Sequence, residues 1–261
     1  MTRVISGITL ALLVLALLFF ATPFIFFIAI NVAIAICLLE LYGIFEKSGD
    51  ASFKTLGVVS AMATGTAIYT EDHAFTLVIL GSAIVTTLSA AILSGGNDPV
   101  KKGITTLFGI FYIAVTLSTL TLIRKEPSGE FLILLLLISN SFCDIFAYYT
   151  GRTFGKTAMA PAISPKKTME GFYGGVAGAV VGAILIKFLF LPGFDVIHTV
   201  MIGFLIGLIG PMGDLTESAI KRRGNVKDSG WIIPGHGGFL DRLDSLIFTS
   251  PLFYIYLKLF T

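Results

Sequence analysis

Charged residues are scarce in this sequence, and their scarcity excludes an ordinary soluble domain. Asp, Glu, Lys and Arg make up 13% of the 261 residues, whereas a soluble globular domain carries about 25%. Cysteine is also rare: Cys37 and Cys143 both lie inside apolar runs, without the Cys-x-x-Cys or Cys/His spacing of a metal or redox site. We therefore expect both thiols to act as small, buried hydrophobic side chains.

Long apolar runs take the place of charge, and hydrophobic residues make up 55% of the chain. Runs of roughly 20 residues are the length that an α-helix needs to cross a bilayer core of about 30 Å. The sequence therefore predicts an all-α polytopic integral membrane protein. The nine candidate transmembrane helices are about 4–20, 23–42, 55–70, 74–93, 103–123, 130–150, 171–190, 196–216 and 240–260.

The basic residues predict an orientation in the membrane. With nine spans, 14 of the 18 Lys and Arg residues fall on the side of the N-terminus and three on the opposite side. Because cytoplasmic loops carry an excess of Lys and Arg, we expect a cytoplasmic N-terminus and a C-terminus on the opposite side. The expected location is the inner (cytoplasmic) membrane of a cell, with the active site facing the cytoplasm.

Polarity divides the chain into two predicted regions. Residues 1–130 form a transmembrane scaffold of about five helices, and residues 131–261 form a candidate catalytic region of about four helices with cytoplasmic loops 151–171 and 217–239. Glu40 is an exception in the first region. It could face a site, but an interfacial position or an ion pair with a basic neighbour is the favoured interpretation. Glycines four residues apart in span 171–190 predict close helix packing.

Carboxylates recur at similar predicted depth in the second region. An ionisable residue at the bilayer centre costs about 3 kcal/mol, so each is a functional candidate. Converging carboxylate oxygens suit hard cations such as Mg²⁺. The alternative is a set of ion pairs with Arg152, Arg242 and Lys221. The four carboxylates are Asp144, Asp214, Asp241 and Asp244. A helix break is expected at Gly210-Pro211-Met212-Gly213, just before Asp214.

Two basic, glycine-rich loops supply the opposite charge. The first is Gly151–Gly171, in which Ser164-Pro165 is a candidate helix start; the second is Ser218–Gly238. Basic side chains and free backbone N–H groups bind polyphosphate, and contact with anionic lipid headgroups is the alternative. The sequence has no P-loop and no Gly-x-Ser-x-Gly motif. The combination predicts phosphoryl or nucleotidyl transfer between a soluble polyphosphate and a lipid.

At these residues the chain resembles the phosphatidate cytidylyltransferases (CDP-diacylglycerol synthases) of bacterial type. The resemblance covers about residues 139–244, and Met169 stands where relatives often have Trp. The fixed positions of the C-terminal signature are Ser218, Lys221, Arg222, Lys227, Asp228, Pro234, His236, Gly237, Gly238, Asp241, Arg242 and Asp244. Upstream matches are Asp144, Gly151-Arg152, Gly155-Lys156 and Ser164–Gly171.

The resemblance implies condensation of CTP with phosphatidate to CDP-diacylglycerol and pyrophosphate by a homodimeric membrane enzyme that needs Mg²⁺, with K⁺ a candidate second cation. No nucleic-acid partner is expected. Metal ligation carries over best to Asp214 and Asp241, with Asp144 and Asp244 the next candidates; these four and Lys221 form the catalytic set. The substrate-binding set is Lys166, Lys167, Ser218, Arg222, Lys227, Asp228, His236, Gly237, Gly238 and Arg242.

Two other functions stay open at this point. A CTP-dependent polyprenol or phytol kinase would share the nucleotide but release CDP and a lipid phosphate. A cation-coupled secondary transporter would use the buried acids as an ion site, although the sequence shows no evident internal repeat. A CDP-alcohol phosphatidyltransferase is disfavoured because the Asp-Gly-x-x-Ala-Arg element is absent.

Overall fold

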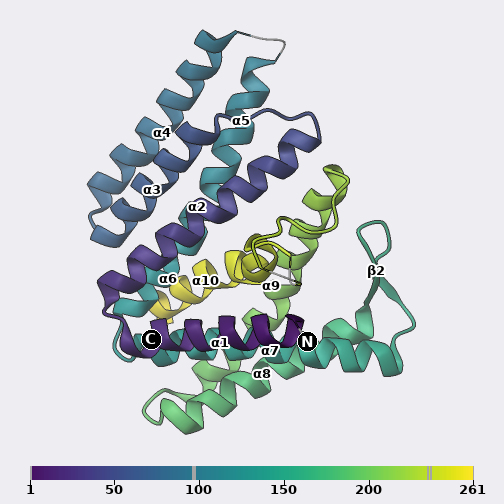
Figure 1. The fold of residues 1–261 in the computed structure, drawn as a ribbon. Coiled ribbons are helices and arrows are strands. Elements are labelled where there is room, and N and C mark those ends of the chain that lie inside the picture. The colour runs from purple at the N-terminus through teal and green to yellow at the C-terminus, as the bar shows by residue number, and fades with distance from the viewer. Residues whose placement is uncertain (1, 96–97, 234, 236, 261) are drawn as a thin grey trace. The chain divides into compact units, whose positions relative to one another are not determined.

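The computed structural model describes residues 2–95, 98–233, 235 and 237–260, with side chains from residue 6 onward. Helices dominate the fold (Figure 1). The elements are α1 (Thr2–Phe20), α2 (Pro23–Lys47), α3 (Lys54–Thr70), α4 (His73–Ser94), α5 (Pro99–Gly109), a π-helical segment (Ile110–Val115), α6 (Thr116–Lys125), α7 (Gly129–Phe154), β1 (Ala158–Ala160), β2 (Ser164–Thr168), α8 (Met169–Phe190), α9 (Val196–Arg223) and α10 (Leu240–Phe260).

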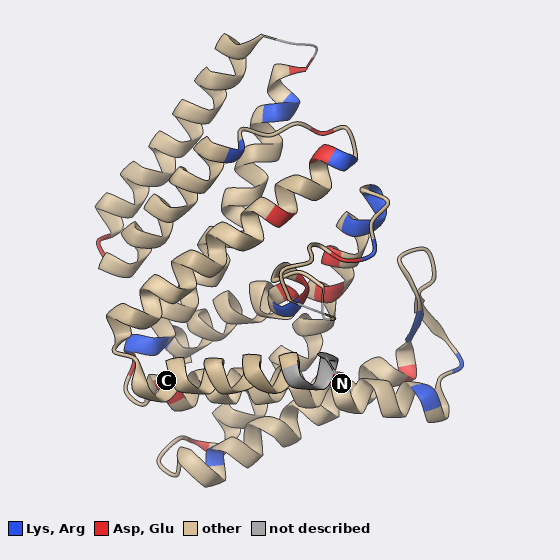
Figure 2. Cartoon of the chain, viewed as in Figure 1, with Lys and Arg blue, Asp and Glu red and all other residues tan. Residues whose placement is uncertain are grey.

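A helical segment lies at each of the nine predicted positions within the described residues, which confirms the all-α polytopic class. Seven of these helices are long and apolar enough to cross a membrane, α5 to α6 counting as one. The other two are shorter: the described apolar part of α1 is Ser6–Phe20, and α3 has 17 residues. Figure 2 shows charged residues mostly at helix ends and in connecting loops, as a lipid environment requires. The orientation in the membrane stays a prediction.

The chain folds into two compact units, unit 1 (residues 1–122 and 220–243) and unit 2 (residues 123–219 and 244–261). In unit 1, α2 packs on α3, α3 on α4 and α4 on α5. Tyr42 is fully buried at the centre and donates its hydroxyl to the carbonyl of Thr106 at 2.6 Å. A Cβ atom at Gly57 or Gly109 would overlap the Tyr42 side chain, so these glycines let the helices approach its ring.

In unit 2, α8 packs along α7. A Cβ atom at Gly178 would lie 2.6 Å from Phe146 Cβ, and one at Gly207 of α9 would lie 2.6 Å from Val176 Cα of α8. Small residues therefore let these helix backbones meet, which confirms the predicted packing role of the glycines. The core of this unit includes Leu135 and Ala179. The predicted division into a scaffold and a catalytic region near residue 130 concerns function, not these compact units, and stays a prediction.

Two local expectations were wrong. Ser164-Pro165 does not start a helix: residues 164–168 form β2, paired antiparallel with β1, and α8 begins at Met169. Thr168 is the N-cap and accepts the Gly171 N–H at 3.1 Å, which explains the later start. Pro211 does not end the preceding span either, because α9 runs through it to Arg223. Membrane helices tolerate an internal proline.

Candidate functional site

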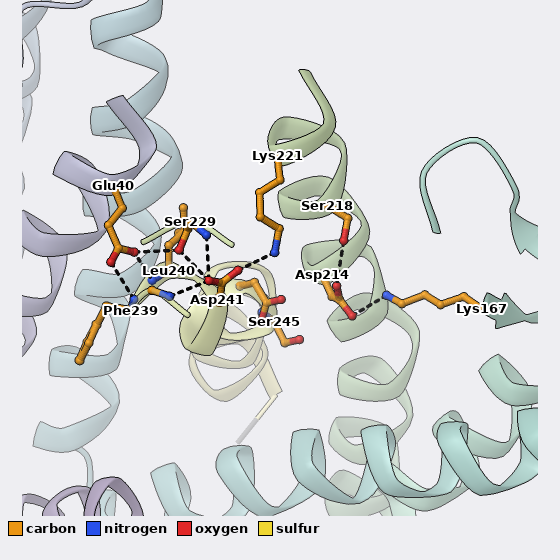
Figure 3. A network of polar contacts seen from close by, with 12 residues as sticks. Glu40, Lys167, Asp214, Ser218, Lys221, Ser229, Phe239, Leu240, Asp241 and Ser245 are labelled. Carbon is orange, nitrogen blue, oxygen red and sulfur yellow. Dashed lines mark hydrogen bonds and ion pairs between the residues drawn. The ribbon is translucent and has the colours of Figure 1, made fainter. Parts of the chain in front are cut away.

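The first polar cluster lies in unit 1, where α10 begins (Figure 3). Lys221 Nζ donates to Asp241 Oδ1 at 2.5 Å. Asp241 Oδ2 accepts the backbone N–H of Ser229 at 2.9 Å, that of Gly238 at 2.7 Å and the Ser229 hydroxyl at 3.0 Å. The Asp241 side chain is 8% exposed and that of Lys221 is 13% exposed. A carboxylate this buried needs such donors, so Asp241 ties the loop before α10 to α9.

The predicted glycines of this loop lie against the same carboxylate. Gly237 has a φ of +84°, in the left-handed region that favours glycine, and a Cβ atom there would lie 2.5 Å from Asp241 Oδ2. A Cβ atom at Gly238 would overlap Ser229 Oγ. Glycine at both positions lets the loop close around Asp241; contact with substrate stays a prediction. His236, another predicted substrate-binding residue, lies outside the described residues.

The second polar cluster lies in unit 2. Lys167 of β2 pairs with Asp214 of α9, with 2.6 Å between Nζ and Oδ2, and Ser218 Oγ donates to Asp214 Oδ1 at 3.3 Å (Figure 3). Asp144 of α7 interacts electrostatically with both Asp214 and Lys167. The Asp214 side chain is 37% exposed and that of Lys167 is 27% exposed. This cluster therefore combines two acids and one lysine, and its Asp214 carboxylate is partly open to solvent.

Helical periodicity explains why three of the predicted site residues lie on the same face of α9. Asp214, Ser218 and Lys221 occupy positions i, i+4 and i+7 of α9, so they share one face of that helix. The sequence predicted a loop over residues 217–239. Residues 217–223 instead continue α9, so the helix sets the direction of the Ser218 and Lys221 side chains.

The hairpin that carries Lys167 is attached to the start of α8. Glu170 accepts the backbone N–H of Lys156 at 3.0 Å and that of Thr157 at 3.2 Å. Thr157 in turn accepts the Met169 N–H through its carbonyl at 2.9 Å. The ends of the hairpin are thereby held together, although β1 and β2 are only three and five residues long.

Most other predicted site residues lie on the surface. Asp244 is half-buried: its carboxylate accepts the Ser245 N–H at 2.7 Å, and a Cβ atom at Gly213 would overlap the Asp244 carbonyl. The roles of the exposed residues stay predictions. They are Lys166, Arg222, Lys227, Asp228 and Arg242.

A further charged group, which the sequence analysis did not single out, supports the end of α9. Asp50 is buried in unit 1, with Lys101 Nζ at 2.5 Å from one of its oxygens and Arg223 Nη2 at 2.6 Å from the other. The hydrogen bond from Lys101 and the nearby Arg223 charge hold the pKa of this carboxyl below its usual value. Asp50 therefore anchors α9 just beyond Lys221.

The fit of the acids to Mg²⁺ depends on the substrate. Among the residues that the structure describes, no three His, Cys, Asp or Glu side chains gather as a metal site. Mg²⁺, however, is usually held by one or two carboxylates together with substrate phosphates and water. Asp214 and Asp144 suit that arrangement. Asp241 pairs with Lys221, as the ion-pair alternative anticipated, so a cation would compete with that lysine.

The structure adds two residues to the unit 1 cluster. Glu40 accepts hydrogen bonds from the Ser229 hydroxyl and from two backbone N–H groups at the start of α10. Its described contacts are with a hydroxyl and backbone N–H groups and include no basic side chain, so the predicted ion pair of Glu40 is not seen among them. Its position relative to the membrane interface stays a prediction. A single acid late in an apolar helix was the available signal. Ser229 lies inside the signature at a variable position, so the motif did not identify it.

Comparison with known proteins supports the resemblance found in the sequence. A model of the cytidylyltransferase family matches residues 1–260, which is nearly the whole chain. The chain belongs to this family. The match includes the N-terminal helices, which by sequence resembled only generic apolar spans.

Curated relatives share part of the chain. A phosphatidate cytidylyltransferase of Bacillus subtilis is 45% identical over 118 residues, covering 45% of this chain and 44% of that protein. One of Rickettsia felis is 41% identical over 158 residues, covering 57% of this chain and 69% of the relative. The uncharacterized protein YnbB of Escherichia coli is 40% identical over 155 residues, covering 59% of this chain and 51% of YnbB. The chain spans about half the length of the first of these curated relatives.

Proposed function

We propose that the protein transfers the cytidylyl group of CTP to phosphatidate, giving CDP-diacylglycerol and pyrophosphate for phospholipid biosynthesis. The observation that carries the proposal is the family match over residues 1–260. Relatives at 41–45% identity that bear the name phosphatidate cytidylyltransferase support it. The proposed enzyme is a multi-pass homodimer in the inner membrane, with its active site facing the cytoplasm, where the predicted topology puts most Lys and Arg residues.

The chemistry asks little of a general base. An oxygen of the lipid phosphate forms a bond to the α-phosphorus of CTP, while the bond from that phosphorus to the oxygen bridging to the β-phosphate breaks and pyrophosphate leaves. A phosphate monoester has a second pKa of about 6, so phosphatidate is already a nucleophile near neutral pH. The protein must bring two polyanions together and stabilise the charge that passes to pyrophosphate.

Basic side chains suit this task. Lys221 and Lys167 each hold a carboxylate in the structure, and an ammonium group can exchange that partner for a phosphate oxygen at a similar distance. We assign them to the phosphates of CTP or of the lipid. Further neutralisation is assigned to the exposed basic residues Lys166, Arg222, Lys227 and Arg242.

The acids complete the proposed site. Asp214 and Asp144 would hold Mg²⁺, and Asp241 and Asp244 are the next candidates, with K⁺ a candidate second cation. Mg²⁺ bound there would neutralise phosphate oxygens and stabilise the departing pyrophosphate. Asp241 has a role without metal as well, because it orients Lys221.

The test is product analysis with the purified protein. It is incubated in nanodiscs with CTP labelled at the α-phosphate, phosphatidate and Mg²⁺, and both lipid and water-soluble products are identified. The proposal expects label in a CDP-lipid, one pyrophosphate released per lipid product, and no turnover in excess EDTA. Release of CDP with a polyprenol phosphate, given a polyprenol in place of phosphatidate, would instead indicate a kinase. Cation flux into liposomes without any CTP chemistry would indicate a transporter.

A further inference from the structure

We propose that Glu40 is a positioning residue, which holds the loop before α10 in the conformation that orients Asp241 and Lys221. The inference rests on the proposed function and adds to its site a residue from the N-terminal half of the chain. All the contacts that carry it lie within unit 1, and Figure 3 shows them.

Glu40 is a buried carboxylate whose donors come from far along the chain. Glu40 is 8% exposed to solvent. Oε1 accepts the backbone N–H of Phe239 at 3.0 Å, and Oε2 accepts that of Leu240 at 2.9 Å. Burial of a charge is costly unless donors compensate it. These two N–H groups open α10, where the helix dipole also favours a negative charge. Glu40 therefore caps α10 from α2.

Ser229 connects this cap to the candidate catalytic pair. Its hydroxyl oxygen lies 2.9 Å from Glu40 Oε2 and 3.0 Å from Asp241 Oδ2. A hydroxyl has one proton to donate, so it can donate to only one of the two carboxylates at a time. The Ser229 backbone N–H and the Gly238 N–H both donate to Asp241. Glu40 and Asp241 thus hold the same two loop segments.

Two glycines permit the close approach of the Glu40 carboxylate. A Cβ atom at Gly230 would overlap Glu40 Oε1, and one at Gly238 would overlap Glu40 Oε2. The loop backbone therefore lies directly on the carboxylate, with no side chain between them. This contact is what a positioning role requires, because a shift of Glu40 has to move the backbone that donates to Asp241.

The chain of contacts gives Glu40 an indirect effect on chemistry. Lys221 is held by Asp241 Oδ1, while Asp241 Oδ2 is held by the loop that Glu40 caps. With the Glu40 charge removed, the N–H groups of Phe239 and Leu240 lose their acceptor, the loop loosens, and Asp241 and Lys221 sample orientations unsuited to the reaction. Glu40 is assigned no contact with substrate, so its loss should affect turnover more than affinity.

The experiment compares Glu40→Gln with Glu46→Gln in the purified full chain. Glu46 lies on the same helix, but its side chain is exposed and its carboxylate pairs with Lys54. We expect kcat for CDP-lipid formation to fall by about tenfold or more in Glu40→Gln, with KM for CTP changed by less than about threefold. Amide hydrogen exchange should rise in the segment 226–243 and stay unchanged in α3. Glu46→Gln should match the parent in all three measurements.

A milder variant guards against misfolding. Ser229→Ala removes the bridge between the two carboxylates but leaves the cap on α10, so a smaller fall in kcat and a smaller rise in exchange are expected. The inference is overturned if exchange in 226–243 is unchanged in Glu40→Gln, if it rises equally in α3, or if kcat equals that of the parent. A parent protein that makes no CDP-lipid, with the exchange change still confined to 226–243, would overturn the proposed function and leave the cap by Glu40 intact.

Discussion

The Asp241 cluster and the Asp214 cluster use the same residue types, an acid, a lysine and a serine, in opposite ways. Asp241 is 8% exposed and makes four described contacts, one to Lys221 and three to loop groups. Asp214 is 37% exposed and makes two described contacts, to Lys167 and Ser218. The first carboxylate is built into its surroundings, and the second is accessible to a ligand. Asp241 therefore has a structural role within unit 1, and the exposure of Asp214 is compatible with the proposal that it binds Mg²⁺.

The largest difference between the clusters should appear on neutralising each acid. Asp241→Asn breaks a buried ion pair, which costs about 3–5 kcal/mol. With each kcal/mol shifting the midpoint of a chain of this size by roughly 2–4 °C, thermal unfolding should occur about 10 °C lower. Activity should be lost. Asp214→Asn breaks a partly exposed pair worth about 0–1 kcal/mol, so activity should fall by about 100-fold with the midpoint nearly unchanged. Equal shifts in the two midpoints would contradict the comparison.

Replacing Lys221 of the Asp241 cluster should reduce activity more than replacing Lys167 of the Asp214 cluster. Lys221→Met removes an ammonium group from a buried carboxylate, Asp241, whereas Lys167→Met removes one from a carboxylate, Asp214, that water can reach. Hydrogen bonds to charged groups contribute about 1.5–3 kcal/mol, so we expect kcat/KM to fall by about 100-fold in Lys221→Met and about tenfold in Lys167→Met. Steady-state kinetics with CTP checks the order. Lys54→Met, which alters an exposed pair on α3, is the matched control, and an equal loss there would indicate a general charge effect.

The tight packing of the Asp241 cluster can be tested with one added methyl group. In Gly238→Ala the Cβ atom overlaps Ser229 Oγ and Glu40 Oε2, and overpacking of this kind costs about 1–3 kcal/mol. Gly43→Ala on α2 is the control, because a Cβ atom there meets nothing within 4 Å and alanine favours helix. Chemical or thermal unfolding should show Gly238→Ala less stable than the parent and Gly43→Ala at least as stable. If Gly238→Ala is as stable as the parent, the loop is less tightly packed than its contacts indicate.

A smaller effect is expected at Asp50, because its partners Lys101 and Arg223 are themselves exposed, at 49% and 59%. Its pKa is lowered in the folded protein, chiefly by the hydrogen bond from Lys101, while an unfolded aspartate has a pKa of about 3.9. A lowered folded pKa stabilises the protein above the unfolded value, and this stability is lost as pH falls through the folded pKa. Asp50→Asn should therefore lower the unfolding midpoint by a few degrees at neutral pH. The difference between the unfolding midpoints of the parent and Asp50→Asn should disappear below about pH 4. A difference that grows on acidification would contradict the ion pair.

Local patterns predicted the helices well and the turns less well. The lengths of the apolar runs predicted where the long helices of the described residues lie, because a helix that crosses lipid must satisfy its backbone internally. The errors came at prolines. Pro165 can start a helix by its φ angle, but here it lies in β2, and Thr168 caps α8 three residues later. Pro211 stays inside α9, which carries Ser218 and Lys221 on helical turns instead of in a loop.

The candidate site was predictable only in part. The signature identified Asp241, Lys221 and the loop glycines because their types and spacing are read directly from the chain. The sequence left the role of Glu40 open, because its partners lie 189 to 200 residues away and no local pattern relates α2 to the loop before α10. Asp50 was missed for the same reason, since Lys101 and Arg223 come from distant segments.

The sequence by itself determined the membrane class, the helices and the family of the protein. These follow from residue type, run length and spacing, which are properties of neighbouring positions. Only the tertiary structure decided which carboxylate is buried and which is accessible, and that Glu40 caps the helix carrying Asp241. The reason is physical: a buried charge is stable only where donors reach it, and here those donors come from segments that meet through folding.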